Sequence, residues 1–273
     1  MLLDAISAER FRLLRDRSTL FWGFAFAPLV GFVLSVGGDL FVRNMIKRPM
    51  PGATVDLAGQ VLKALGGGAS TFSALFLMIG AAAILAGDYR WETWRLLTPR
   101  NTRPNLLGAK LLVVGEAILW NLVLTVILTL AAAVISAGIS GKTLVGSANS
   151  IGLGQIAGAF VVTWLEAMTL ASLAACVAVI SRSTMGVVVV CLGARFVQSI
   201  LSSVLGAMAP ETWKTYAIPA YDADLLRAFV SAPFHGGVTN GAAGVALLVL
   251  LAWATILTVA AIALFGRQDL TRE

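Results

Sequence analysis

Three ionisable residues stand inside long apolar stretches of the 273-residue sequence: Glu116, Glu166 and Arg195. A charge in such a setting needs an oppositely charged partner or a water-filled cavity, because exposing it to hydrocarbon costs about 3 kcal/mol or more. Conventional catalytic patterns are missing. The sequence has one histidine and two cysteines, and it has neither a G-x-S-x-G nucleophile motif nor a two-histidine zinc motif. We therefore expect a chain that is not an enzyme and that holds no metal and no cofactor.

Glu166 and Arg195 are predicted to meet. A turn centred on 181–184 separates two apolar stretches, and Glu166 precedes Ser181 by about as many residues as Arg195 follows it. In an antiparallel helical hairpin the two side chains then lie at the same depth, where they form an ion pair or share a network. This pair either fixes the packing of two helices or contacts a transported solute. Glu116 lies close to Lys110 and is expected near the cytoplasmic interface.

The elements that position these residues are membrane-spanning helices. Hydrophobic residues make up 58% of the sequence and charged residues only 12%, against about a quarter charged in soluble domains, and the mean hydropathy is +0.88. Six apolar stretches have the length of a spanning helix, about 20 residues. The alternating apolarity of a β-barrel is absent. We therefore predict an all-α polytopic membrane protein forming a single transmembrane domain over 1–273, with spans at about 19–37, 66–86, 111–138, 152–180, 184–209 and 242–265.

Basic residues orient the chain. More Lys and Arg residues lie on the side of the N-terminus than on the other side, so the positive-inside rule places both termini in the cytoplasm. The net charge of +6 then reflects topology and contact with anionic lipids. No basic–aromatic module typical of nucleic-acid binding is present. The glycine–lysine–threonine run at 141–143 lacks the first glycine of a phosphate-binding loop, so no nucleotide site is expected in this chain.

Three segments outside the spans have patterns of their own. Residues 1–18 form an amphipathic pattern typical of an interfacial elbow helix, although a simple charged flank of the first span is the alternative. Outer segments are expected at 38–65, where prolines break any continuous helix, and at 210–241. In the second of these, Asp222 and Asp224 precede an apolar run and are interpreted as caps of a short helix rather than as a cation site. The charged positions of the elbow helix are Glu9, Arg10, Arg12, Arg15 and Arg17.

The loop between the second and third spans, residues 87–110, is longer and more charged than a helical hairpin requires. A helix at about 88–97 would place two tryptophans near the membrane surface and project charge into the cytosol, and prolines at 99 and 104 would end it. Such a segment is suited to docking a soluble partner; a lipid-facing helix without a partner is the alternative. The residues assigned to this docking role are Asp88, Arg90, Trp91, Glu92, Thr93, Trp94, Arg95, Arg100 and Arg103.

This loop resembles the first coupling segment of type-2 ABC exporter permeases. The family pattern runs from an acidic residue through glycine–threonine, a basic residue with two leucines, a proline and an arginine to leucines before a lysine. This sequence matches the pattern, except that Glu92 replaces the glycine. The segment from Glu9 to Arg17 is similar to the family's elbow helix. The run from Phe265 to Asp269 is similar to its F-x-R-R-D ending, with Gln268 in place of the second arginine. The matching loop positions are Asp88, Thr93, Arg95, Leu96, Leu97, Pro99, Arg103, Leu106, Leu107 and Lys110.

The resemblance implies a multi-pass subunit of the bacterial plasma membrane that pairs with a second permease copy or a related permease. It implies that ATP and Mg²⁺ bind a separate cytosolic ATPase docked at the loop, and that Glu92 and Arg95 transmit force. The cargo class is hydrophobic or amphipathic: a lipid, a peptide or a drug-like molecule. An extracytoplasmic partner is compatible with the outer segments. Two other functions stay open: an ion-coupled secondary transporter that uses Glu166 and Arg195, and a membrane assembly or scaffold subunit.

Overall fold

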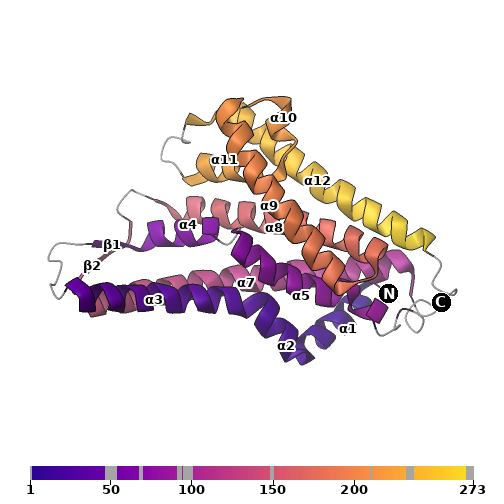
Figure 1. The fold of residues 1–273 in the computed structure, drawn as a ribbon, viewed down its shortest axis with the longest axis horizontal. Coiled ribbons are helices and arrows are strands. Elements are labelled where there is room, and N and C mark those ends of the chain that lie inside the picture. Colours follow the sequence, from indigo (N-terminus) through magenta and orange to yellow (C-terminus); the bar gives the residue numbers. More distant parts are fainter. Residues whose placement is uncertain are drawn as a thin grey trace.

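The fold is a bundle of long helices, seen in a computed structural model that describes residues 2–46, 54–67, 70–90, 94, 101–147, 151–209, 211–231 and 237–268 (Figure 1). The helices are α1 (Leu2–Arg15), α2 (Arg17–Thr19), the π-helix η1 (Leu20–Ala25), α3 (Phe26–Ile46), α4 (Leu57–Gly67), α5 (Thr71–Arg90), α7 (Arg103–Ser140), α8 (Leu153–Ser181), α9 (Thr184–Met208), α10 (Trp213–Tyr216), α11 (Pro219–Ser231) and α12 (Asn240–Arg267). Two short strands, β1 (Thr54–Asp56) and β2 (Thr143–Val145), pair in parallel.

Six helices in the described part of the chain are long and apolar enough to cross a membrane, which confirms the predicted all-α polytopic architecture. Their bounds differ clearly from those expected in three places. The first helix continues to Ile46, well beyond the predicted end at 37. The third begins at Arg103 rather than at 111, because Pro104 fits the first turn of a helix, where its missing N–H is not needed. The predicted start of the second span at 66 is wrong, since 57–67 form the separate helix α4 and α5 begins at Thr71.

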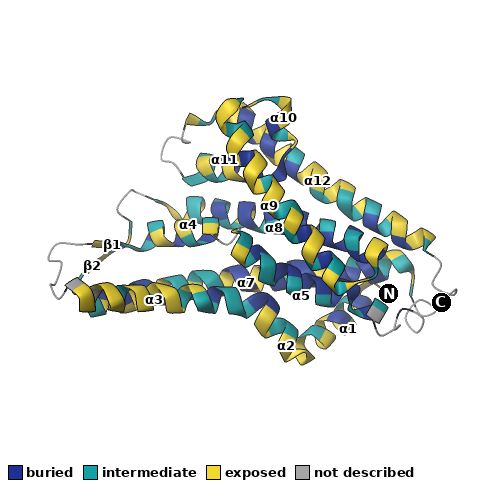
Figure 2. Cartoon of the chain, viewed as in Figure 1, coloured by how far each residue is buried: buried dark blue, intermediate teal, exposed yellow. Residues whose placement is uncertain are grey.

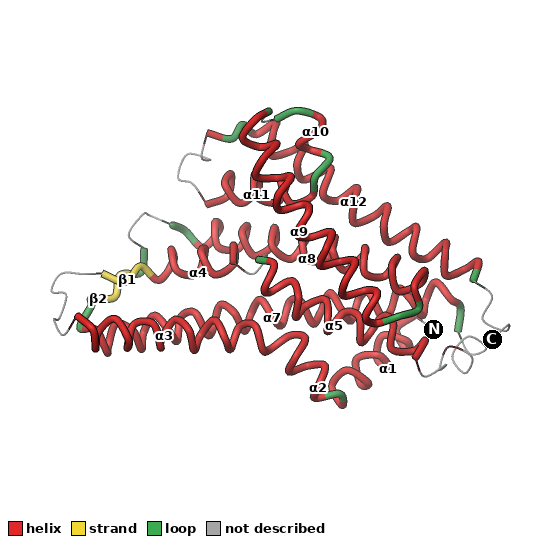
Figure 3. The backbone as a smooth tube through the Cα atoms, viewed as in Figure 1, coloured by secondary structure: helices red, strands yellow, loops and turns green. Residues whose placement is uncertain are grey.

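The bundle has two ends, which we call the loop end and the far end. The loop end carries α1, the start of α7 and the last turn of α12 (Figure 1), where Trp94 packs against Phe265. The far end carries β1, β2 and α4 beside the ends of α3 and α7, with α10 and α11 placed above them in the same view. β1 and β2, at the far end, are the strands among the described residues (Figure 3).

Small side chains let the central helices pack closely. α5 and α8 contribute alanines to the main core, among them Ala81 and Ala174, which are fully buried. Where η1 crosses α5, Gly23 lies against Gly80, and a Cβ on Gly23 would come within 2.5 Å of the Gly80 Cα. By contrast, α3, α9 and α12 turn apolar side chains outward (Figure 2), as surfaces in contact with lipid tails do.

The predicted capping role of two aspartates at the far end is wrong. Asp222 and Asp224 do not cap a helix, because α11 begins at Pro219 and both residues lie inside it. Proline suits this start, since its ring fixes the backbone angle of a first helical turn. Asp222 is fully buried, and both of its carboxylate oxygens lack a hydrogen-bond partner among the described residues.

Candidate functional site

A buried ionic cluster at the loop end joins three helices. Lys110 of α7 has a side chain that is only 3% exposed. Its ammonium lies 2.7 Å from Asp88 of α5 and 3.1 Å from Glu9 of α1, and it donates to the carbonyl of Ile84 at 2.9 Å. Two hydrogen bonds and an ion pair thus hold the ammonium between α1 and α5. Lys110 therefore acts as a structural tie between α7 and these two helices.

Arg12 completes this cluster. Its guanidinium contacts Glu9 at 2.9 Å and Asp88 at 3.1 Å. Burial opposes the charged form, but the two carboxylates outweigh it and raise the pKa of Arg12. Glu9, Asp88, Lys110 and Arg12 thus form a neutral set of two carboxylates and two cations, which we call the loop-end cluster. The charges of Glu9 and Arg12 consequently hold α1 against the bundle.

Trp94 is buried in this end of the bundle and connects the loop to α12. It is 2% exposed, its ring lies 4.5 Å from that of Phe265, and Lys110 sits 5.4 Å from its ring centroid, within the range of a cation–π contact. Arg103 donates to the carbonyls of Phe265, Gly266 and Gln268 at 2.6–3.3 Å. These bonds satisfy carbonyls that the end of a helix leaves without partners.

Gln268 has a role that the sequence did not indicate. Its side chain accepts a hydrogen bond from Tyr89 of α5 at 2.9 Å and donates to the carbonyl of Val179 of α8 at 3.1 Å. The last turn of α12 is thereby attached to two further helices. Hence α1, α5, α7, α8 and α12 are all connected directly at the loop end.

The remaining elbow residues lie at the surface. Arg10 forms an ion pair with Glu116 of α7 at 2.5 Å, and both side chains are partly exposed. Arg15 and Arg17 are exposed. α1 turns Leu3, Phe11 and Leu14 outward, at 78%, 63% and 64% exposure, while Ala5 and Glu9 are buried. An apolar outer face of this kind suits a helix lying in the membrane interface.

Several predicted docking residues cannot be placed. Trp91, Glu92, Thr93, Arg95 and Arg100 lie outside the described residues, as does most of the helix expected at 88–97. Arg90 is the last residue of α5. Of the nine positions assigned to docking, the structure brings together Asp88, Trp94 and Arg103.

A second ionic cluster lies between the spans and α11. Arg195 of α9 contacts Glu166 of α8 at 2.6 Å, which confirms the pairing predicted from the hairpin. The other oxygen of Glu166 accepts a hydrogen bond from Arg227 of α11. Arg227 also contacts Asp224 at 2.8 Å. We call Glu166, Arg195, Arg227 and Asp224 the intramembrane cluster; it too balances two carboxylates with two cations.

Arg227 and Asp224 were missed in the sequence. Both lie in the segment interpreted as an outer loop, and only their helical i, i+3 spacing indicated that they pair with each other. Asp224 also accepts a hydrogen bond from Ser202 of α9 at 3.4 Å. α11 is therefore held against two spans, α8 and α9, by polar contacts.

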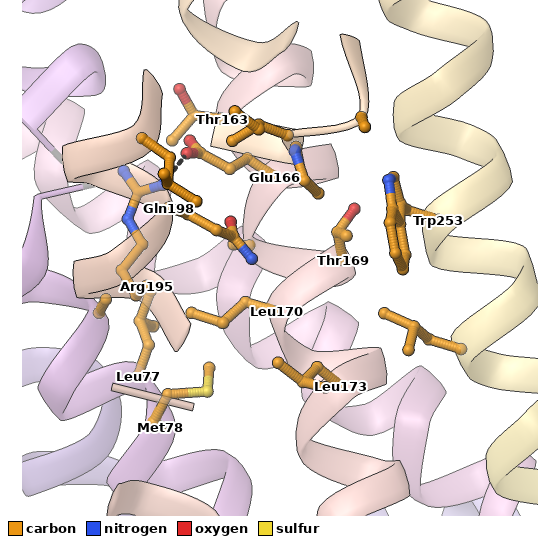
Figure 4. A pocket seen from close by; sticks show the side chains of 17 residues that line it. Leu77, Met78, Thr163, Glu166, Thr169, Leu170, Leu173, Arg195, Gln198 and Trp253 are labelled. Carbon is orange, nitrogen blue, oxygen red and sulfur yellow. Dashed lines mark hydrogen bonds and ion pairs between the residues drawn. The ribbon is translucent and has the colours of Figure 1, made fainter. Parts of the chain in front are cut away.

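A cavity of about 250 Å³ borders the intramembrane cluster (Figure 4). α5, α8, α9 and α12 line it, together with residues 217–219. Its walls are mostly apolar, as at Leu170 and Leu173, and its polar side chains are few: Glu166, Arg195, Gln198, Thr163 and Thr169. Binding pockets for small molecules have this composition, apolar walls with a few polar groups that fix orientation. Its chemistry suits an uncharged or amphipathic molecule, since the charges beside it are paired.

The geometry offers no catalytic constellation in the described residues: no cluster of metal-ligating side chains is found there, and Cys176 and Cys191 are buried singly. No protein-family model and no curated protein matches the sequence. The class that the fold defines is therefore a six-span helical membrane protein.

Proposed function

We propose that this chain is the membrane-spanning permease subunit of a type-2 ABC exporter. It moves a hydrophobic or amphipathic cargo, such as a lipid, a peptide or a drug-like molecule, while a separate cytosolic subunit hydrolyses ATP. The chain itself is not an enzyme. The proposal rests on the sequence resemblance and on one structural observation, the connected loop end.

That observation carries the proposal because force applied to a loop does work only if the loop is fixed to the helices that must move. Trp94 of the loop contacts α12 and Lys110, and the loop-end cluster joins α7 to α5 and α1. A partner that pushes on residues 91–100 therefore displaces several helix ends together rather than bending one connection.

The orientation follows from the same proposal. The loop end faces the cytosol of a bacterial cell, both termini lie there, and α1 serves as an elbow helix in the inner interface of the plasma membrane. Two cytosolic ATPases dock at the loops of a permease dimer, built from two copies or from this chain and a related permease, and Mg²⁺ and ATP bind the ATPases. The far end is then extracytoplasmic and accessible to a partner there.

The cavity beside the intramembrane cluster supports a transport role. It is enclosed by four spans that a rocking motion would separate, and its apolar lining matches an apolar or amphipathic cargo. Glu166 and Arg195 contribute by holding α8 and α9 in one relative position in each state.

Assembly and coupling test the proposal. The proposal predicts that a gene adjacent to that of this chain encodes an ABC ATPase; the two proteins are co-expressed, and the purified complex is assayed for ATP hydrolysis in nanodiscs. We expect a stable complex whose hydrolysis depends on the permease, and we expect Glu92→Lys and Arg95→Glu to reduce it at least tenfold. Lys214→Glu, a charge reversal on the exposed far end, is the matched control. If both loop reversals leave assembly and hydrolysis unchanged, the docking assignment is wrong.

An ion-coupled secondary transporter is the second candidate, since Glu166 lies beside a cavity. The geometry disfavours it: both carboxylate oxygens of Glu166 already accept hydrogen bonds from guanidinium groups, so neither is open to a carried cation. Cargo movement in liposomes that hold an ion gradient and no ATPase would support this candidate over the exporter.

A further inference from the structure

A second and larger cavity, of about 620 Å³, forms a groove at the far end between α3, α4 and α7. It is separate from the cavity beside Glu166, with which it shares no lining residue. Along α7 its lining runs from Asn121 to Ser136, about 22 Å at the 1.5 Å rise of a helix. The volume lies within the range of about 300–1,000 Å³ typical of ligand sites.

The groove is apolar along its length and charged at one end. Val30 and Leu34 of α3 and Leu128 of α7 line its walls, whereas Asp39, Lys63 and Lys142 line the end near β1 and β2. Lys142 and Asp39 are 3.8 Å apart, a loose ion pair, and Lys63 is exposed. The residues that line the groove itself thus include two cations and one carboxylate, while Asp56 of β1 lies outside the lining.

Ser136 is an independent sign of a missing ligand. It lines the groove near its charged end, is 5% exposed, and its hydroxyl makes no hydrogen bond within the described part of the chain. Thr125 on the same face of α7 donates instead to the carbonyl of Asn121. A buried hydroxyl without a partner destabilises the fold, and a hydrogen-bonding ligand in the groove would remove that cost.

The position of the groove relative to the bilayer fits a lipid. α7 has 38 residues and is about 57 Å long, whereas the hydrocarbon core is about 30 Å thick. With the exposed Arg10–Glu116 pair at one interface, the middle of the groove lies about 19 Å into the hydrocarbon and Ser136 lies about 30 Å away, at the opposite interface, with Lys142 beyond it. An anionic lipid has the same arrangement, with its acyl chain in the hydrocarbon and its charged headgroup at the interface.

We propose that this groove binds an anionic amphiphile. Its acyl chain lies between α3 and α7, and its acidic headgroup lies between Lys63 and Lys142 within the reach of Ser136. Binding needs neither ATP nor an ATPase, so the inference does not depend on the proposed transport function.

Photo-crosslinking tests the site directly. The purified chain is placed in phosphatidylcholine nanodiscs doped with phosphatidylglycerol that carries a diazirine on its acyl chain, and labelled residues are mapped by mass spectrometry. We expect labelling concentrated on the groove walls of α3 and α7. Unlabelled phosphatidylglycerol should compete at least tenfold better than phosphatidylcholine, because two lysines face the headgroup. Inorganic phosphate should not compete, since the acyl chain supplies most of the contact.

Two sets of variants distinguish the contribution of the lipid headgroup to binding from that of its acyl chain. Lys63→Gln with Lys142→Gln should abolish the preference for phosphatidylglycerol while labelling by the acyl chain persists. Ala132→Trp should fill the groove and suppress labelling, and its matched control Val134→Trp lies on the same helix with an exposed side chain. Folding of each variant is checked by size-exclusion chromatography and thermal unfolding.

Uniform labelling of all lipid-facing helices would overturn the proposal. So would an unchanged lipid preference in the folded double lysine variant, or displacement of the lipid by inorganic phosphate. Each of these results concerns binding alone and would leave the ATPase-coupling assignment standing.

Discussion

The two ionic clusters have the same formal composition, two carboxylates and two cations, and opposite surroundings. In the loop-end cluster Lys110 and Asp88 are almost completely buried, with side chains 3% and 6% exposed, and Arg12 at the edge of the cluster is 44% exposed. In the intramembrane cluster Arg195 and Arg227 keep somewhat more exposure, Asp224 is 63% exposed, and a cavity adjoins Glu166.

This difference indicates two mechanical roles. A cluster whose central ammonium is buried between two carboxylates and a carbonyl permits few other arrangements, so the loop end is expected to move as a unit. A cluster beside empty space, with one member reaching solvent, can exchange partners without leaving a charge unpaired. We expect helix rearrangement near Glu166 and rigidity near Lys110.

The largest effect is expected from Lys110→Met, which leaves Glu9 and Asp88 buried with Arg12 as their remaining cationic contact in the cluster. Breaking a buried ion pair by removing one partner costs about 3–5 kcal/mol. Thermal unfolding in detergent should show a strongly destabilised protein. Lys214→Met, at an exposed position, is the control, and equal stability of the two variants would contradict the structural role of Lys110.

The intramembrane pair should show coupling in a double-mutant cycle. Glu166→Gln and Arg195→Gln should each destabilise the fold, and the double variant should cost less than their sum by about 1–2 kcal/mol, because each single change already removes the shared interaction. Folded yield and thermal unfolding measure it. Strictly additive effects would mean that the contact contributes no stability.

Asp222 differs from the carboxylates of the two clusters, because it is buried and forms no ion pair with a cation among the described residues. Burial raises its pKa to about 8 from a usual value of 3.8. The folded state then keeps a proton that the unfolded state loses, so stability is expected to fall as pH rises from about 4 to about 8 and to stay level above.

Asp222→Asn removes that dependence. We expect the variant to be more stable than the original chain at pH 8, by about 1–3 kcal/mol, and similar to it near pH 4. Thermal unfolding at the two pH values measures the difference. Parallel pH profiles for the two proteins would show that Asp222 is ionised in the fold.

The smallest effect is expected at the Arg10–Glu116 pair, whose side chains are 54% and 36% exposed. Exposed ion pairs contribute about 0–1 kcal/mol, so Arg10→Gln should change the unfolding temperature little. Its effect should also shrink in high salt. A loss as large as that of Lys110→Met would mean that α1 is held mainly by its surface contact.

The sequence predicted interactions between residues that are close along the chain, and it did not predict interactions between residues that are far apart along the chain. Spans show as continuous apolar runs, and the Glu166–Arg195 pair joins neighbouring spans, so its register can be counted from the turn. The sequence places Lys110 near the cytoplasmic interface but does not indicate its partners, because Glu9 and Asp88 lie far away along the chain. For the same reason it places Arg227 in the outer segment 210–241 without indicating its contact with Glu166. The groove depends on how α3, α4 and α7 pack, and no local periodicity encodes that packing.

Accessibility of the cavity in the presence and absence of ATP tests the central claim most directly. In a chain with Cys176 and Cys191 replaced by serine, Gln198→Cys places a thiol on the cavity wall, and Trp213→Cys is an exposed control. The complex with its ATPase is treated with a membrane-impermeant maleimide. An ATP-driven permease predicts that ATP changes the labelling rate at position 198 at least fivefold while position 213 stays constant. Identical rates at position 198 with ATP, with ADP and without nucleotide would contradict it.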